Sequence, residues 1–238
     1  VASCTVEQFE NVAEAVEKGY AANRVYNLWD ESFNNDLLAD FASIYSGIIN
    51  DADGYQLLFA SDIDFGNSQF ASGVCENKFV PLDFSSVSDG VAIDGLDHTI
   101  RNFCYVSDNG NASFFKELNY SSISNLNFDG AYVKGAGSGA SVGVLADEMN
   151  FGGIFDVSVT NAIVISTENA GGLVGEALGV AKFSGNKVQA LLEGDKVGGL
   201  AGYHAKSTMN QFAPVIENNQ VDIFAKTVLD DGKELCVG

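Results

Sequence analysis

The sequence predicts an all-β protein, a right-handed parallel β-helix (β-solenoid) with a small N-terminal helical cap. Three observations predict this fold. Glycine-centred blocks recur about every 30 residues, short stretches of alternating apolar and polar residues precede them, and 26 glycines accompany only two prolines. Many glycines with few prolines suit many turns between strands whose N–H groups are all hydrogen-bonded.

The second half of the chain carries the clearest repeat. Three blocks align, at 141–146, 170–175 and 197–202. Their third residues fall at 143, 172 and 199, so the steps are 29 and 27 residues. A degenerate copy, residues 112–115, lies one similar step before the first block. A fixed period of this size indicates a solenoid, and the absence of a 3.6-residue periodicity in these units argues against helical repeats.

A second element recurs upstream of each block. Apolar and polar residues alternate through 123–128, 154–159, 183–188 and 216–221. This alternation is the period of a half-buried strand. A single unit cannot bury its own apolar face, so we expect successive units to stack with a spacing of about 4.8 Å.

The first fifty residues have a different pattern. Thr5 and Gln8 have the spacing of a capping box, and apolar stripes with helical spacing follow, one ending near Gly19 and one within 37–48. A cap would cover the unpaired edges at the end of a solenoid. We therefore predict a helical cap over residues 1–50 and a parallel β-helix over residues 51–238.

With this register, the sequence resembles the GLUG-motif group of bacterial and archaeal surface proteins. The signature block Gly-Gly-Leu-hydrophobic-Gly is matched at 171–175 and 198–202, and strands typical of the family are matched at 55–64 and 93–100. The resemblance covers about residues 51–225 and departs from the family at Ala146, where the block ends in glycine. It implies a parallel β-helix scaffold in a cell-surface or secreted protein. It does not imply any one activity, and it makes His98 a turn or packing residue.

The charge of the chain disfavours several classes of partner. Acidic residues number 32 against 12 basic residues, for a formal net charge of −20. Nucleic acids and anionic membrane surfaces attract clustered Lys and Arg, so we expect neither as a partner. No apolar run reaches the roughly 18 residues of a membrane span, and we predict no membrane insertion. Residues 1–4 lack the regions of a signal peptide, so we expect any export signal to have been removed.

Candidates for catalysis are few. The acidic pairs are Asp51 and Asp53, Asp62 and Asp64, Asp94 and Asp97, and Asp230 and Asp231. Residues two apart share a face of a strand, so Asp62 and Asp64 could both point outward, but glycosidase chemistry would need a further strand to position them. His98 and His204 lack the nucleophile and acid of a triad. We predict no catalytic residue and no cofactor.

The sequence matches a calcium-binding motif only in part. Residues 50–54 resemble part of an EF-hand loop, but the motif would place Ile49 at the first ligand position. Asp62, Asp64 and Asn67 remain possible oxygen ligands, although solvated turn carboxylates are the simpler interpretation. We predict no metal site.

The four cysteines are more informative. Cys75 and Cys104 are separated by one repeat length, which would place them on adjacent coils within disulfide range. A disulfide between stacked coils is predicted, with two buried free thiols as the alternative. Cys4 and Cys236 lie near opposite ends, so we expect either a tail folded back along the barrel or an end-to-end contact between two chains.

The sequence therefore predicts a non-catalytic extracellular or cell-surface module, adhesin-like or filament-forming. Its expected partners are a glycan or protein ligand, or other copies of itself end to end. The competing hypothesis is a polysaccharide-active β-helix enzyme. That hypothesis requires acidic residues stacked on successive coils, with aromatic rings such as Tyr132 or Tyr203 beside them.

Overall fold

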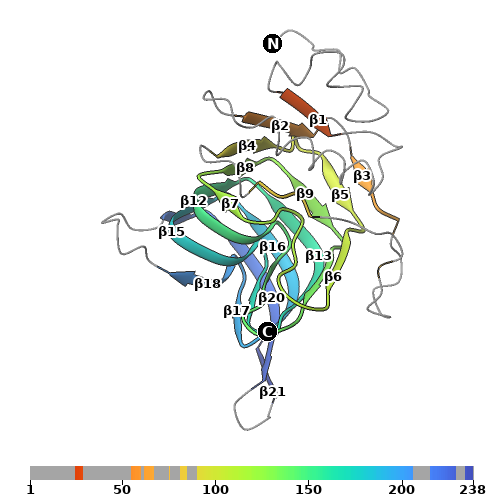
Figure 1. Cartoon of the computed structure of the whole chain (residues 1–238), viewed down its shortest axis with the longest axis vertical. Coiled ribbons are helices and arrows are strands. Elements are labelled where there is room, and N and C mark those ends of the chain that lie inside the picture. Colours follow the sequence, from red (N-terminus) through yellow and green to blue (C-terminus); the bar gives the residue numbers. More distant parts are fainter. Residues whose placement is uncertain are drawn as a thin grey trace.

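The computed structural model describes residues 25–28, 55–59, 62–66, 75, 81–84, 90–205, 215–228 and 234–237. These residues form an all-β, right-handed parallel solenoid. Figure 1 shows the coils stacked along the long axis, from the N-terminal end to the C-terminal end. The predicted solenoid is confirmed.

Three sheets run along the stack. The first has the order β1 (Val25–Leu28), β2 (Tyr55–Phe59), β4 (Val91–Asp94), β8 (Ser122–Ser124), β12 (Ala146–Phe155), β15 (Val174–Ser184) and β18 (Ala201–Ala205), with β7 (Leu118–Asn119) beside β12 and β19 (Val215–Glu217) beside β15. The second has the order β3 (Ile63–Asp64), β5 (Thr99–Arg101), β9 (Asn127–Asp129), β13 (Ser158–Ile165), β16 (Lys187–Glu193), β20 (Gln220–Val228) and β21 (Glu234–Val237), with β10 (Tyr132–Gly135) joining β13 to β6 (Cys104–Ser107). The third consists of β11 (Ser141–Gly143), β14 (Asn169–Gly171) and β17 (Lys196–Gly198).

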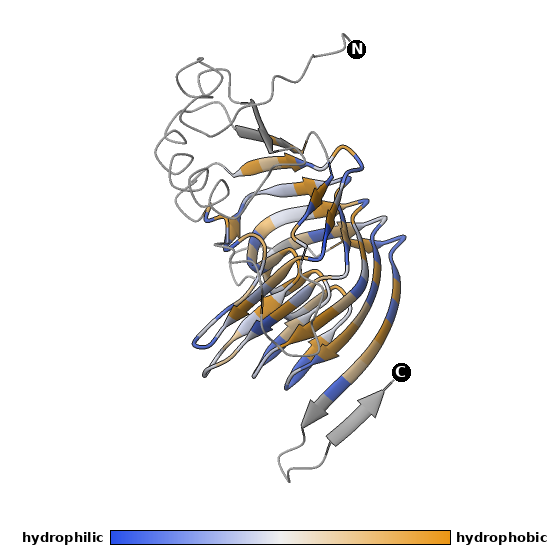
Figure 2. Cartoon of the chain, turned by 90° about the vertical axis from the view of Figure 1, so that its right-hand side faces the viewer, coloured by the Kyte–Doolittle hydropathy of each residue, from blue (hydrophilic) through white to orange (hydrophobic). Residues whose placement is uncertain are grey.

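Residues of successive coils stack in columns. One column of the first sheet contains Ile93, Ile123, Ile154, Phe183 and Ile216. Four of these are the first positions of the alternating stretches found in the sequence, so that part of the predicted register is confirmed. Inward members of such columns form one hydrophobic core, and Figure 2 shows apolar and polar positions alternating along the strands.

The predicted alignment of the first glycine block was wrong by one residue. Gly143 pairs with Gly171, not with Gly172, and Gly171 pairs with Gly198. Ala146 then stands opposite Val174, so it does not replace the final glycine of the block. The residue at that position is Asp147, since Ala146 pairs with Val174 and Glu148 pairs with Glu176.

The final glycine of the later blocks is explained by close backbone packing. A Cβ at Gly175 would lie 2.4 Å from the backbone nitrogen of Val142, and a Cβ at Gly202 would lie 2.6 Å from that of Ala170. Strands of the third sheet therefore pass directly against the first sheet at these points, which leaves no room for a side chain.

The predicted helical cap was wrong. Within residues 1–50 the structure describes only β1, which pairs in parallel with β2 and so belongs to the first sheet. Its sequence, Val-Tyr-Asn-Leu, contains the β-branched and aromatic residues that favour strands. Both expected helical stripes lie outside the described residues, and no helix occurs in the described part of the chain. Accordingly, no helix that could span a membrane is found there.

The corner between the first and second sheets is held by buried asparagine. Asn186 is fully buried; its Oδ1 accepts a hydrogen bond from the Val157 N–H (3.0 Å), and its Nδ2 donates to the Ile154 carbonyl (2.9 Å). Nδ2 also lies 2.9 Å from Oδ1 of Asn219 on the next coil. The first two bonds satisfy buried backbone groups at the corner, and the third links the corner to the next coil.

The predicted disulfide is confirmed. Cys75 and Cys104 are bonded, with their Cα atoms 5.4 Å apart. Cys104 is buried at the start of β6, where it pairs with Tyr132 of β10. The bond therefore fastens a residue outside the regular strands to the second sheet.

Reduction of this disulfide is expected to lower the free energy of unfolding by about 2–4 kcal/mol, because the reduced chain gains conformational freedom when unfolded. Urea unfolding with and without reductant measures the effect. A Cys75→Ser/Cys104→Ser double variant should unfold at the same urea concentration under both conditions. Equal midpoints for the oxidised and reduced parent chain would contradict the expectation.

Candidate functional site

Asp62 is occupied by contacts between coils. Its Oδ2 lies 2.7 Å from Nη1 of Arg101, and its Oδ1 accepts a hydrogen bond from the Thr99 N–H (3.0 Å) and lies 3.2 Å from Nδ1 of His98. The hydrogen bond from Arg101 is the main reason why the pKa of Asp62 falls to about 2. The carboxylate is thus an ion-pair partner that joins two coils, and His98 belongs to the same contact.

The neighbouring predicted carboxylates have similar structural roles. Asp64 accepts hydrogen bonds from the Gly66 N–H and from Nδ2 of Asn102, both at 2.8 Å. Asp94 accepts from the Leu96 N–H at 2.9 Å, and Asp97 lies in the same turn in a left-handed conformation. Among the residues the structure describes, no group of three His, Cys, Asp or Glu is arranged to hold a metal ion.

The remaining candidates are dispersed. His204 is exposed on β18, and Tyr132 is buried in the second sheet. Cys236 lies in β21, opposite Lys226 in the antiparallel pairing with β20. Six candidates lie outside the described residues: Cys4, Asp51, Asp53, Asn67, Asp230 and Asp231.

A different set of carboxylates stacks on the outer face of the first sheet. Glu148 of β12 pairs with Glu176 of β15, and Glu117 precedes the Leu118–Met149 pair, so it stands beside Glu148 on the other side. Glu176 in turn pairs with Tyr203 of β18. We call Glu117, Glu148 and Glu176 the carboxylate ladder. It is an arrangement of acidic residues on successive coils with an aromatic ring at one end.

Amide side chains hold two members of the ladder in place. Nδ2 of Asn119 lies 2.8 Å from Oε1 of Glu117, and Nδ2 of Asn150 lies 2.8 Å from Oε1 of Glu148. No ion pair to the ladder is found among the described residues. Burial, together with the charges of Glu117 and Glu176, raises the pKa of Glu148.

Asp147 lies next to the ladder in sequence but is buried. Burial raises its pKa to about 7, despite hydrogen bonds from the Glu148 N–H and the Asn111 side chain, which lower it. This carboxyl group therefore changes its charge near neutral pH.

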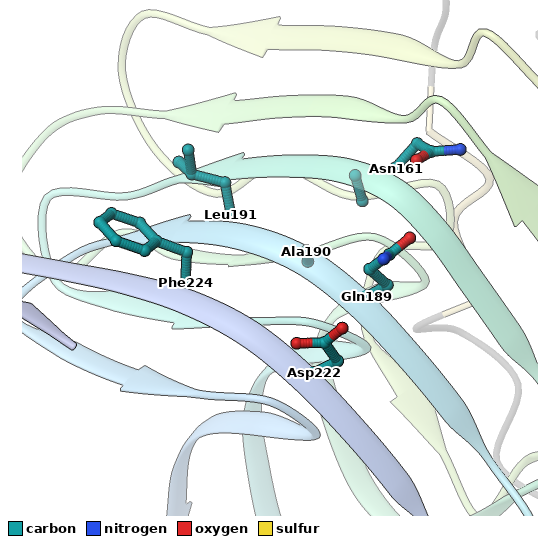
Figure 3. A pocket seen from close by; sticks show the side chains of 7 residues that line it. Asn161, Gln189, Ala190, Leu191, Asp222 and Phe224 are labelled. Carbon is teal, nitrogen blue, oxygen red and sulfur yellow. The ribbon is translucent and has the colours of Figure 1, made fainter. Parts of the chain in front are cut away.

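The outer face of the second sheet carries a shallow hollow of about 250 Å³. It lies over β13, β16 and β20, and its lining residues are Asn161, Ala162, Gln189, Ala190, Leu191, Asp222 and Phe224. Figure 3 shows the apolar side chains Leu191 and Phe224 at one side, and the polar side chains Asn161, Gln189 and Asp222 at the other. We call this feature the hollow.

Two outward columns build the hollow. Gln189 and Leu191 of β16 pair with Asp222 and Phe224 of β20, so polar residues stack on polar residues and apolar on apolar. Leu191 is 39% exposed and Phe224 is 46% exposed. The hollow therefore offers an apolar wall and a row of hydrogen-bonding groups on one rigid sheet.

Sequence reasoning missed both sites, although signals for them exist. Leu191 breaks the apolar–polar alternation of β16, and Phe224 repeats that break at the paired position of the next coil. The ladder can be recognised only when the pairing of β12 with β7 and β15 is known. The alignment of the glycine blocks in the sequence placed β12 one residue out of register with β15.

Comparisons with known proteins support the fold only. Neither a family model nor a curated protein matches the chain. A solved structure from Bacteroides ovatus, described as a "putative immunoglobulin A1 protease", is similar with a TM-score of 0.51 and 15% sequence identity, over 85% of this chain and 67% of that one. At this identity the likeness shows the solenoid architecture and carries no activity over.

Proposed function

We propose that the chain is a non-catalytic extracellular or cell-surface module that binds a ligand on the outside of its solenoid. The hollow is the observation that carries this proposal. It combines exposed apolar groups with amides and a carboxylate, and it contains a single ionisable side chain, Asp222, among its described lining residues. Glycoside hydrolysis generally uses two carboxyl groups, so the hollow suits binding rather than turnover.

Two further features support an extracellular location. The Cys75–Cys104 disulfide is compatible with an oxidising compartment. The glycine blocks resemble those of the GLUG-motif surface proteins, which favours an adhesin-like role.

A filament-forming variant of this function has its own support. Ile216 and Val221 continue inward columns, yet they are 59% and 43% exposed on the last described coil. An apolar layer of this kind suits stacking against another copy end to end, a heterologous contact that builds fibres.

The carboxylate ladder favours one alternative, a polysaccharide-active enzyme. It provides acidic residues on successive coils, next to Tyr203, as that hypothesis requires. In this alternative, the raised pKa of Glu148 would suit a proton donor.

We expect the chain to bind an extracellular ligand without cleaving it. A glycan and protein array combined with a reducing-end release assay measures both properties, and electron microscopy of the same sample detects filaments. Release of sugar ends that is lost in a Glu148→Gln variant would instead establish the enzyme. Absence of binding, turnover and filaments together would overturn the proposed function.

A further inference from the structure

The geometry of the hollow points to a specific class of ligand. Because side chains alternate along a strand, Gln189 and Leu191 point outward while Ala190, between them, points to the core. The two outward columns are thus separated by about 7 Å along the strands. The small residues Ala162 and Ala190 also line the hollow.

A β-bulge adds the third polar group. Val159 pairs with Val188 but Ala162 pairs with Ala190, so β13 has one extra residue opposite Gln189. The bulge places Asn161 in a left-handed conformation (φ 53°), and its Nδ2 donates to Oδ1 of Asp129 at 2.8 Å. Bulges commonly redirect a side chain next to a binding site, and here the anchored amide lines the hollow beside Gln189 and Asp222.

We propose that the hollow binds one neutral or amino sugar of an extracellular glycan. The C–H face of the sugar ring packs against Phe224 and Leu191, and its hydroxyl or amino groups bond to Asn161, Gln189 and Asp222. Amide side chains both donate and accept hydrogen bonds, as sugar hydroxyls do. This inference rests on the proposed function, and it adds the ligand class and the residues that bind it.

Charge and size favour this occupant. Asp222 and the net charge of −20 oppose an anionic sugar and also oppose a second copy of the chain on this face. The hollow, at about 250 Å³, is smaller than the 300–1,000 Å³ typical of pockets for drug-sized ligands. A stable complex with a protein partner would need roughly 800 Å² of contact surface on this side. The apolar wall of the hollow consists of only two side chains, Leu191 and Phe224, which is too small an area for such a contact.

Titration calorimetry of the whole chain tests the proposal with neutral, amino and anionic oligosaccharides: cello-oligosaccharides, chitosan oligosaccharides and oligogalacturonate. We expect binding of a neutral or amino sugar, and at least about tenfold weaker binding of the anionic one. Phe224→Ala should weaken binding about tenfold through lost ring contact, and Gln189→Ala should weaken it severalfold. Tyr120→Ala is the matched control and should leave binding unchanged, because Tyr120 is a 62% exposed aromatic residue that belongs neither to the hollow nor to the carboxylate ladder.

The outcomes separate this inference from the proposed function. Glycan binding that is unchanged in both hollow variants overturns the inference and leaves a binding module with its site elsewhere. Tightest binding of the anionic sugar, or binding of protein ligands alone, also overturns it. Binding of nothing, in the calorimeter and on the array, counts against both. Because Phe224 and Gln189 are exposed, unchanged circular dichroism melts should show that the variants remain folded.

Discussion

Replacing Asp147 with asparagine is expected to stabilise the chain at pH 8 and to remove much of the pH dependence of its stability between pH 4 and pH 7. Burial raises the pKa of Asp147 to about 7 in the folded chain, from an ordinary value of 3.8. Between these values the folded state binds more protons than the unfolded state, so stability falls as pH rises. At about 1.4 kcal/mol per pH unit, the cost of the charged form at pH 8 is on the order of 4 kcal/mol.

Asparagine tests this account because it keeps the shape and the acceptor oxygen of the protonated acid. The carboxyl group interacts with the Glu148 N–H and the Asn111 side chain, and an amide can retain both contacts. Urea unfolding of the parent and the variant at a series of pH values measures the difference. Asp108→Asn, an exposed position, loses the same formal charge and controls for the net charge of −20.

The two proteins should be nearly equal in stability at pH 4, should diverge progressively between pH 4 and pH 7, and should keep a constant difference above about pH 7. Parallel pH profiles for Asp147→Asn and the parent chain would contradict the expectation. Asp62 acts in the opposite direction, because its pKa is lowered to about 2. Its contribution is lost as pH falls below about 4, and exposure of the ion pair to solvent keeps that contribution small.

The sequence was sufficient to predict the solenoid, because strand alternation and repeat length are local signals. The columns through Ile123 and Ile154 follow directly from those signals, and so does the Cys75–Cys104 pair at one coil length. The left-handed corner residues, such as Asn125 and Asp156, also agree with the turn residues in the sequence.

The sites could not be predicted because they depend on register across coils of unequal length. The coil step from Lys187 to Gln220 is several residues longer than the step from Ala170 to Val197. A fixed period therefore cannot show that Leu191 stands beside Phe224. The helical cap failed for a related reason, since β1 is defined by pairing with β2, a full coil further along the chain.

Phe114 lies in a buried aromatic cluster, next to the coil with the longest residue step between described strand pairs. That coil runs from Ile63 to its paired residue Ile100, and the degenerate block in the next coil carries Ser113 and Phe114 at the positions of Gly171 and Gly172. The Phe114 ring is fully buried and packs against its aromatic neighbours at centroid distances of 4.9 Å to Phe115, 5.1 Å to Phe103 and 5.4 Å to Phe128. Aromatic rings therefore fill the core beside this block.

Phe114→Ala is therefore expected to lower the free energy of unfolding by about 3–5 kcal/mol, from lost burial and the cavity left behind. Phe224→Ala is the matched control, since its 46% exposed ring should change stability by no more than about 0.5 kcal/mol. Each coil contacts mainly its neighbours, so the loss should be local as well as large. Hydrogen exchange should show lost protection of backbone amides in β5 and β9, with β16 and β20 much less affected. A uniform loss of protection over all described coils would contradict this expectation and would show that the solenoid unfolds as one unit.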